Sequence, residues 1–251
     1  MSTITSAAAS CDELLLEAEK SLANRQLHAA IGMFYRAEQA GANPDCCSAG
    51  RWMAYMLLGD FAAAWRESDA IEERKFRDAD KFLDSNAIAG KKIIVRCLHG
   101  FGDTVQFLRY ASCLEKTAAN VIWELQPALM EMAPYFYGIR NFITWNNHLC
   151  YGTDWDVQLE VMDLPYLFRT TIEDLPLTEN YIQLPDQALY SIANQMDQRS
   201  MPRIGLVWQA GEWNPARSIP FHLLEPILQN QDCEFWNLQG GSNVLLQNVQ
   251  E

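Results

Sequence analysis

The chain has 251 residues, of which 49% are hydrophobic and 20% charged, so it can form one large domain or two smaller ones with a packed core. Its net charge is −13 at pH 7, and acidic residues outnumber basic ones along the whole length. Without a basic stripe, we expect no binding to a nucleic-acid backbone or to an anionic membrane surface.

The cysteine and histidine patterns narrow the class of protein further. There are seven cysteines, an odd number with no C-x-x-C pair, which favours reduced thiols in a cytoplasmic protein. The four histidines stand at no ligand spacing, so we expect no metal site and no cofactor. The N-terminus lacks the features of a signal peptide, and no apolar run approaches the roughly 18 residues of a membrane span.

The first part of the chain has an internal repeat. Residues 12–40 and 46–74 are both helical in pattern, and they match each other at one constant offset. Matched positions include Leu27 with Phe61, Ala30 with Ala64, and Ile31 with Trp65. This pattern resembles the tetratricopeptide repeat, although Trp52 stands where a small residue is usual. We predict four antiparallel helices in two hairpins, within a repeat-and-linker region at residues 1–89.

Two repeats are few for an independent solenoid, because each repeat buries its apolar face only against a neighbour. We therefore expect this region to lean on the domain that follows. Two interpretations of its role stay open: a surface for a protein partner, or a plain helical hairpin pair with no partner.

The next part alternates short apolar runs with helical patterns. Strands are expected at 92–97, 120–125, 142–145 and 156–159, and helices at 104–116, 164–170 and 187–198. The alternation predicts an α/β fold with a Rossmann-like parallel sheet at residues 90–200. A strand, helix and strand at 203–208, 221–228 and 234–238 predict the start of a second α/β domain at residues 201–251.

One loop with unusual composition follows the first expected strand, where ligands bind in open α/β sheets. Residues 98–104 read LHGFGDT, and we take His99, Gly100, Gly102 and Thr104 as candidate ligand-binding residues. The two glycines would allow positive φ and close backbone approach. Asp103 is a candidate general base for an acceptor hydroxyl. The alternative is that Asp103 or Thr104 is simply the N-cap of the next helix.

A second such loop follows the strand expected at 203–208. Residues 209–220 read QAGEWNPARSIP, and this is long for a connection from strand to helix. Arg217 is a candidate for pairing with a phosphate, and Ser218 for donating a hydrogen bond to it. The alternative is a solvated arginine, with Ser218 or Pro220 beginning the next helix.

Three blocks of sequence carry a resemblance to a known family. Residues 91–110, KKIIVRCLHGFGDTVQFLRY, resemble the opening of the glycosyltransferase-like domain that follows tetratricopeptide repeats in many bacterial proteins. Residues 155–171 and 203–220 are similar to later blocks of the same family, in the same order. The family is related to the heptosyltransferases and, more distantly, to the O-linked N-acetylglucosamine transferases.

The resemblance implies a GT-B fold, with acceptor on the first Rossmann-like domain and nucleotide-sugar donor on the second. Asp103 matches the aspartate proposed as base in the heptosyltransferases, and Arg217 matches a basic residue that contacts donor phosphate. The second domain has only about 50 residues here, against on the order of 100–150 for a complete half. We therefore expect little transferase activity from this length of chain. The alternative function is a non-catalytic interaction scaffold.

Overall fold

The computed structural model describes residues 9–75, 87–145, 155–176, 180–195, 201–210 and 214–240. The chain divides into two compact units, Met1–Pro185 and Asp186–Glu251. In the parts of the chain that the structure describes, no helix has the length and apolar character needed to cross a bilayer.

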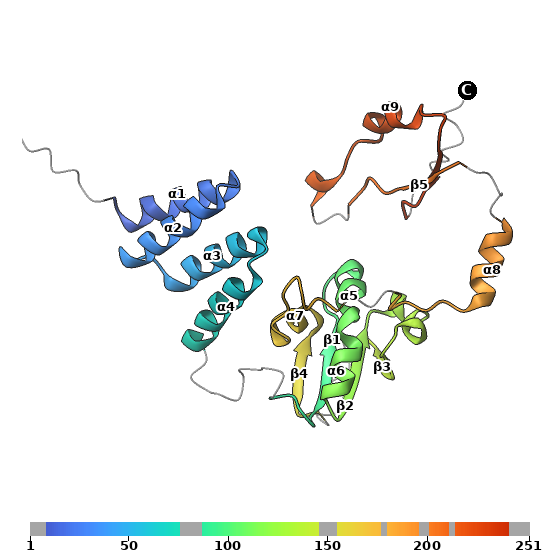
Figure 1. The fold of residues 1–251 in the computed structure, drawn as a ribbon, viewed down its shortest axis with the longest axis horizontal. Helices are drawn as coiled ribbons and strands as arrows, with labels where there is room; N and C mark the ends of the chain where they lie inside the picture. The colour runs from blue at the N-terminus through green and yellow to red at the C-terminus, as the bar shows by residue number, and fades with distance from the viewer. Residues whose placement is uncertain are drawn as a thin grey trace, which may run out of the picture. The chain divides into compact units, whose positions relative to one another are not determined.

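The first unit begins with four helices, as predicted. They are α1 (Cys11–Ala23), α2 (Leu27–Gln39), α3 (Pro44–Leu58) and α4 (Phe61–Lys75). Each helix packs against the next one along the chain (Figure 1). The first residues of α2 and α4, Leu27 and Phe61, are a matched pair of the sequence repeat, so the two helices begin at equivalent positions. The matched residues Ala30 and Ala64 are both fully buried.

The ends of these helices follow from local sequence. Ser10 caps α1 in a capping box with Glu13, so two backbone N–H groups are satisfied by side chains. The Asn43 side chain accepts from the first turn of α3, and Pro44 occupies the first helical position, where its missing N–H is not needed. Gly59 ends α3 with φ of 77°, a conformation that favours glycine.

The two hairpins meet along α2 and α3. Gly50 of α3 faces Phe34 of α2 so closely that a Cβ at position 50 would overlap the phenyl ring. Phe34 is 2% exposed and belongs to a core with Leu14, Ala18 and Cys47. The absent side chain at Gly50 therefore allows the two helices to approach and to enclose Phe34.

A buried arginine links both hairpins. Arg51 of α3 donates from Nε to Glu67 Oε1 at 2.7 Å and from Nη2 to Glu67 Oε2 at 2.8 Å. Its Nη1 donates to Glu38 of α2. Burial alone would lower the pKa of Arg51, but the hydrogen bonds to Glu67 and Glu38 outweigh it and raise that pKa. The guanidinium thus stays charged between one carboxylate from each hairpin.

A four-stranded parallel sheet follows, as predicted. Its strands are β1 (Lys92–Arg96), β2 (Asn120–Leu125), β3 (Asn141–Thr144) and β4 (Val157–Glu160), in the spatial order β3-β2-β1-β4. β1 is central and buried on both faces, as expected for a parallel sheet covered by helices. Its Ile93 pairs with Val121 of β2 and with Val157 of β4.

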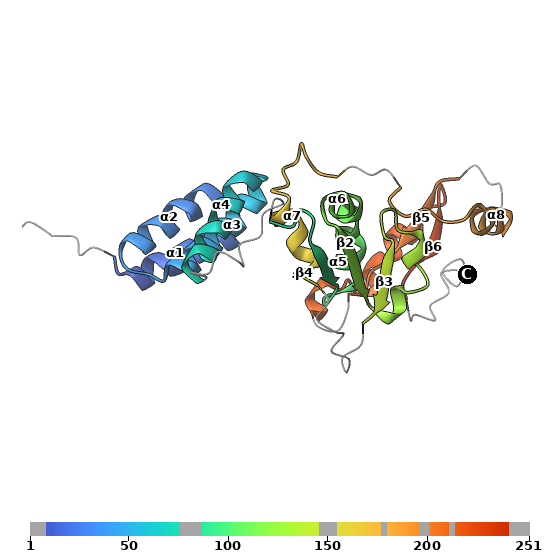
Figure 2. The same cartoon turned by 90° about the horizontal axis from the view of Figure 1, so that it is seen from below.

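Helical segments cover the sheet. Between β1 and β2 the chain forms α5 (Phe101–Phe107), the 3₁₀-helix η2 (Leu108–Tyr110) and α6 (Ala111–Thr117). Figure 1 shows α5 and α6 against one face of the sheet, and Figure 2 shows α6 again on one side of the strands. The sequence predicted one helix over 104–116. The observed helix begins earlier, at Phe101, because Gly100 is its N-cap, and it tightens into η2 midway.

The remaining connections of the first unit are short. They are η3 (Pro127–Leu129), η4 (Ala133–Tyr135), η5 (Val161–Asp163) and α7 (Leu164–Leu167). Pro127 opens η3, which is a single 3₁₀ turn.

The four helices do lean on the α/β part of the same unit, through α4. Trp65 donates from Nε1 to the carbonyl oxygen of Thr170 at 2.8 Å. Asp69 accepts from the Tyr166 hydroxyl at 2.6 Å and lies 2.7 Å from Arg169 Nη2. One face of α4 is therefore fixed by a buried indole and by a polar cluster.

The second unit contains α8 (Asp186–Gln195), β5 (Arg203–Leu206), η6 (Pro215–Arg217), η7 (Phe221–Leu224), α9 (Glu225–Leu228) and β6 (Glu234–Asn237). β5 and β6 pair in parallel, as the predicted strand–helix–strand pattern requires. The helix predicted over 221–228 divides into η7 and α9, with Pro226 in the first turn of α9. The last residues of the helix predicted at 187–198 lie outside the described residues.

Candidate functional site

The strand order places one edge of the sheet at a topological switch point. From β1 the chain moves to β2 and β3 on one side, and β4 then pairs with β1 on the other side. Where the order reverses in an open parallel sheet, the loops beyond the carboxyl ends of the two strands on either side of the reversal diverge and leave room for a ligand. Here those loops follow β1 and β4, at His99 and Glu160. We call this region the switch-point edge.

The loop after β1 turns directly into α5. Cys97 N donates to the Glu124 carbonyl oxygen at 3.0 Å, which continues the pairing with β2 beyond Arg96. Gly100 is the N-cap of α5, and Asp103 lies at its third position. Asp103 Oδ2 accepts from Gly100 N at 3.1 Å. Neither Asp103 nor Thr104 is the N-cap, yet the Asp103 carboxylate does a capping task by satisfying the N–H of Gly100.

Asp103 keeps part of its carboxylate available. Its side chain is half-buried, and among the described residues no hydrogen bond is found to Oδ1. A carboxylate held by one oxygen and open at the other can accept a proton from a hydroxyl placed beside it. The structure therefore shows the carboxylate of Asp103 in a capping task, and the general-base role of Asp103 stays a prediction.

Thr104 and Gln126 hold the loop from beneath. Thr104 is fully buried, and its hydroxyl exchanges hydrogen bonds with the Gln126 amide at 2.8 and 3.1 Å. Gln126 Nε2 also donates to the carbonyl oxygen of His99 at 2.9 Å. Thr104 therefore supports the loop rather than facing a ligand directly.

His99 and Glu160 meet across the switch point. His99 Nε2 lies 2.6 Å from Glu160 Oε1, with the imidazole 52% exposed and the carboxylate 28% exposed. That carboxylate oxygen is itself buried and receives no well-aligned hydrogen bond from the described residues. The contact brings together the loops after β1 and β4, and it presents a partly exposed imidazole at the edge.

The two glycines of this loop do not have the conformation expected from the sequence. Positive φ occurs at Gly41, Gly59, Gly90 and Gly138 among the described glycines, and neither Gly100 nor Gly102 is one of them. Gly100 is extended, with φ of −68° and ψ of 157°. A Cβ at Gly102 would meet nothing within 4 Å. The glycines leave the loop surface open, but the backbone path itself does not require them.

Below the edge the sheet carries a buried charge and a buried thiol. Glu124 of β2 is fully buried and accepts from Arg96 Nε of β1 at 2.6 Å. Burial raises the pKa of the Cys97 thiol to about 12, against the smaller lowering effect of a hydrogen bond with Thr104. The Cys97 thiol is therefore neutral and unreactive at neutral pH.

The other predicted residues lie in the second unit. Arg217 is the last residue of η6 and is exposed. Ser218 Oγ accepts from Ala210 N at 3.0 Å, and Ile219 N donates to the Trp208 carbonyl oxygen at 2.9 Å. The loop after β5 therefore folds back on itself around Ser218. Residues 211–213 of this loop lie outside the described residues.

The structure thus groups His99, Gly100, Gly102, Asp103 and Thr104 at the switch-point edge, and Arg217 with Ser218 in the other unit. Two residues of the switch-point edge were not predicted from the sequence, namely Gln126 and Glu160. Each stands at the end of an expected strand, and polar residues at the ends of neighbouring parallel strands meet at one edge. The order of the strands, which makes Glu160 a neighbour of His99, was not visible in the sequence.

Among the described residues there is no cluster of three or more His, Cys, Asp or Glu side chains that could hold a metal ion. Comparison of the chain with models of known families found no match. No match was found among curated proteins or among solved structures either.

Proposed function

We propose that this protein belongs to the machinery of sugar transfer, and that the switch-point edge is the acceptor side of a nucleotide-sugar-dependent glycosyltransferase site. The observation that supports this most is the placement of Asp103. It is a half-buried carboxylate four residues along the chain from His99, which contacts Glu160 where the strand order reverses. Among the described residues, no hydrogen bond is found to one of its two oxygens. The resemblance of residues 91–110 to the opening of such a domain points the same way.

The proposed reaction needs one proton acceptor at this edge. Asp103 takes the proton from a hydroxyl of the acceptor, while the oxygen of that hydroxyl forms a bond to the anomeric carbon of the sugar. The bond from that carbon to the donor diphosphate breaks, and the diphosphate leaves with the electron pair. His99, oriented by Glu160, is suited to hold the acceptor by a hydrogen bond.

Donor binding is assigned to the second unit. Arg217 is exposed on η6, and a guanidinium matches two phosphate oxygens at once. Ser218 Oγ accepts from Ala210 N, and among the described residues no hydrogen bond is found from its own hydroxyl proton. These two residues would hold the diphosphate of a nucleotide-sugar.

The test measures the binding of nucleotides and the release of sugar from nucleotide-sugars. Calorimetric titration with UDP, GDP, ADP and CDP should show saturable binding of at least one, weakened about 10-fold or more in Arg217→Ala, since a hydrogen bond to a charged group contributes about 1.5–3 kcal/mol. Release of sugar from a panel of nucleotide-sugars should be slow, and Asp103→Asn should reduce it about 10²–10⁴-fold. Nucleotide binding that is equally strong in Arg217→Ala, or sugar release that is unchanged in Asp103→Asn, would contradict the roles proposed for these two residues.

A matched control separates catalysis from capping. Asp60 accepts from Ala63 N at 3.0 Å through its side chain at the start of α4, so it also caps a helix. Asp60→Asn should leave sugar release unchanged. An equal loss in both variants would mean that damaged capping explains the effect, and Asp103 would be removed from the mechanism.

One observation favours a second candidate, a non-catalytic scaffold. The Asp103 carboxylate already satisfies Gly100 N, so a purely structural reason exists for that residue. In that case α1–α4, fixed to the α/β part through Trp65 and Asp69, would present a rigid surface to a partner. Stability would then fall in Asp103→Ala while no nucleotide bound to the chain at all.

A further inference from the structure

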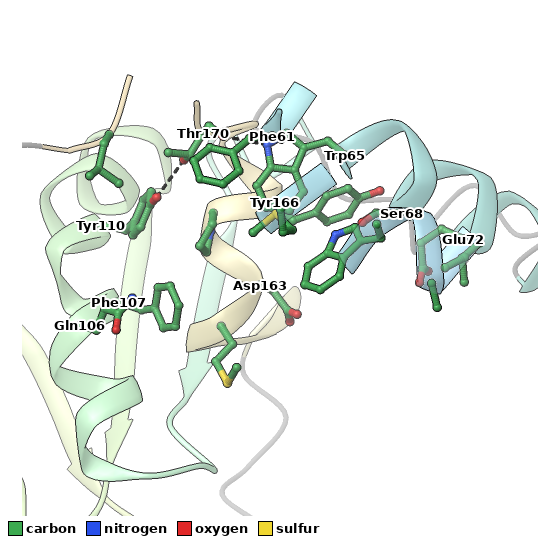
Figure 3. Close-up of a pocket in the computed structure, with 17 residues that line it drawn as sticks. Phe61, Trp65, Ser68, Glu72, Gln106, Phe107, Tyr110, Asp163, Tyr166 and Thr170 are labelled. Atoms are coloured by element: carbon green, nitrogen blue, oxygen red, sulfur yellow. Dashed lines mark hydrogen bonds between the residues drawn. The ribbon is translucent and has the colours of Figure 1, made fainter. Parts of the chain in front are cut away.

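A cavity of about 610 Å³ lies within the first unit, and Asp103 is not among its lining residues. α3 and α4 form one wall, and α5, η2, η5 and α7 form the other (Figure 3). Its volume falls within the roughly 300–1,000 Å³ of sites that hold small organic molecules. We call it the helix–sheet pocket.

Aromatic rings make up much of the lining, and several are fixed in place. Trp65 and Tyr166 lie 5.8 Å apart between ring centres, and Phe61 lies 6.4 Å from Trp65. The polar tips of these rings are already engaged. Trp65 Nε1 donates to Thr170 O, and the Tyr110 hydroxyl donates to Thr170 Oγ1 at 2.9 Å. Arg169 covers one face of Tyr166, and Phe168 stacks on Tyr110. The pocket therefore offers a ligand the remaining carbon surface of these rings together with Trp52, Phe61 and Phe107.

Trp52 is a lining residue that the packing of the repeat does not explain. It lines the pocket from α3 and is only half-buried. The matched position in the first repeat is Ala18, which is fully buried in the core of the first hairpin. Alanine fills this position in the first repeat, so the repeat itself does not require an indole here.

The charged side chains of the lining have one sign. Glu72 and Asp163 line the pocket, and no Lys, Arg or His is among its described lining residues. Figure 3 shows Glu72 on α4 and Asp163 on the opposite wall. A nearby cation, Arg169, lies 4.2 Å from the Tyr166 ring centre, but it is paired with Asp69 at 2.7 Å. Glu72 and Asp163 therefore give the pocket a net negative charge.

We propose that the helix–sheet pocket binds an organic cation, namely an amine or quaternary ammonium group carried on an aliphatic or aromatic body. Ring faces attract cations through their negative π surface, and two carboxylates add to that attraction. The apolar part of the ligand fills the space between Trp52, Phe61 and Phe107. A sugar would need many more hydrogen-bonding groups than this lining provides. The proposal does not depend on the sugar-transfer function.

The experiment compares three probes of equal chain length on the full chain: hexyltrimethylammonium, hexanol and hexyl sulfate. Binding is followed by tryptophan fluorescence and by calorimetry at about 0.15 M salt, where long-range attraction to the acidic protein is screened. We expect saturable binding of the ammonium, weaker binding of the alcohol, and weakest binding of the sulfate. Equal binding of the three probes, or no saturation, would overturn the proposal.

Neighbouring glutamates supply matched variants. Glu72→Gln removes a carboxylate from the lining, while Glu73→Gln removes one from the exposed next residue outside it. We expect Glu72→Gln to raise the Kd for hexyltrimethylammonium about 2–5-fold, and Glu73→Gln to leave it unchanged, as for a partly exposed ion pair. Trp52→Leu should weaken binding of both the ammonium and the alcohol, with an unchanged circular dichroism spectrum confirming the fold. Equal effects of the two glutamate variants would refute a specific site.

Discussion

The two helical hairpins share one backbone plan but differ in what their repeat positions contact. Ala30 and Ala64 are matched and equally buried, and they serve the packing of helix on helix. Ile31 is half-buried in the first hairpin, whereas its match Trp65 is 8% exposed and bonded to Thr170. The shared small residues thus maintain the repeat, and the residues that differ create the contact with the sheet.

The same contrast explains the helix–sheet pocket. Ala18 and Ile31 of the first hairpin correspond to Trp52 and Trp65 of the second, and both tryptophans line the pocket. The repeat therefore sets where these side chains lie, and the two tryptophans make the second copy a wall of the helix–sheet pocket. Comparing the two copies separates residues that fold the repeat from residues that serve a contact.

The largest expected effect comes from the indole that distinguishes the second hairpin. Trp65→Ala should lower the free energy of unfolding by about 4 kcal/mol, because a large buried ring and a buried hydrogen bond are lost. Ile31→Ala, at the matched position, should cost about 1 kcal/mol, since that side chain is half-buried. Urea unfolding of both variants measures the difference. Similar losses would show that the two hairpins are equivalent after all.

Arg51 tests whether the hairpins behave as separate units. Arg51→Met should cost about 3 kcal/mol, because the buried Glu67 would lose its cationic partner and keep the longer hydrogen bond from the Tyr35 hydroxyl. Since Arg51 also binds Glu38, hydrogen exchange should rise in both hairpins together. The exposed Arg36→Met is the control, expected to stay within about 0.5 kcal/mol. Faster exchange confined to α3 and α4 would contradict this coupling.

Two glycine-to-alanine substitutions should change the stability of the protein in opposite directions. Gly50→Ala should destabilise by about 2 kcal/mol, since the new methyl group overlaps the Phe34 ring in a packed core. Gly32→Ala should stabilise by about 0.5–1 kcal/mol, because that helical position has open space and alanine favours helix. Thermal unfolding should show a lower midpoint temperature for Gly50→Ala and a higher one for Gly32→Ala. A neutral Gly50→Ala would mean that α2 and α3 can separate without cost.

The smallest expected effect is a dependence on alkaline pH. Burial, and then the hydrogen bond to Asp69, raise the pKa of Tyr166 above its ordinary value of 10.0. The stabilisation from this raised pKa is therefore fully present below about pH 10 and is lost as pH rises above it, where the unfolded phenol ionises first. Tyr166→Phe should flatten part of the decline in unfolding free energy between pH 9.5 and 11, by about 1 kcal/mol at most. Burial also raises the pKa values of Tyr35, Tyr110 and Cys97, so these groups contribute to the decline as well.

Tyr190 provides the control for that titration, because its side chain is 70% exposed in the second unit. Tyr190→Phe should leave the alkaline decline unchanged. A decline that is unaffected by Tyr166→Phe would show that the phenol does not contribute to holding α4.

Much of the fold could be predicted from sequence periodicity. The four helices and the strands from Lys92, Asn120 and Asn141 lie close to the predicted positions, because apolar period and caps are local signals. The start of α5 was missed, since Gly100 gives no side-chain signal for an N-cap. Glu160 and the helix–sheet pocket were missed because they depend on which strands and helices become neighbours. The tetratricopeptide and GT-B assignments stay predictions.

The strand order also has a consequence for how the molecule folds. Ile93 pairs with Val121 of β2, the next strand along the chain, and with Val157 of β4, the last strand of the sheet. The pairing of β1 with β4 creates the switch-point edge, and it closes a much longer loop than the pairing of β1 with β2. Closing a longer loop costs more chain entropy, and non-local strand pairs form late. We therefore expect β1 and β2 to associate first, with β4 joining afterwards. A partly folded chain would then have its core strands and the Asp103 helix in place while His99 still lacked Glu160.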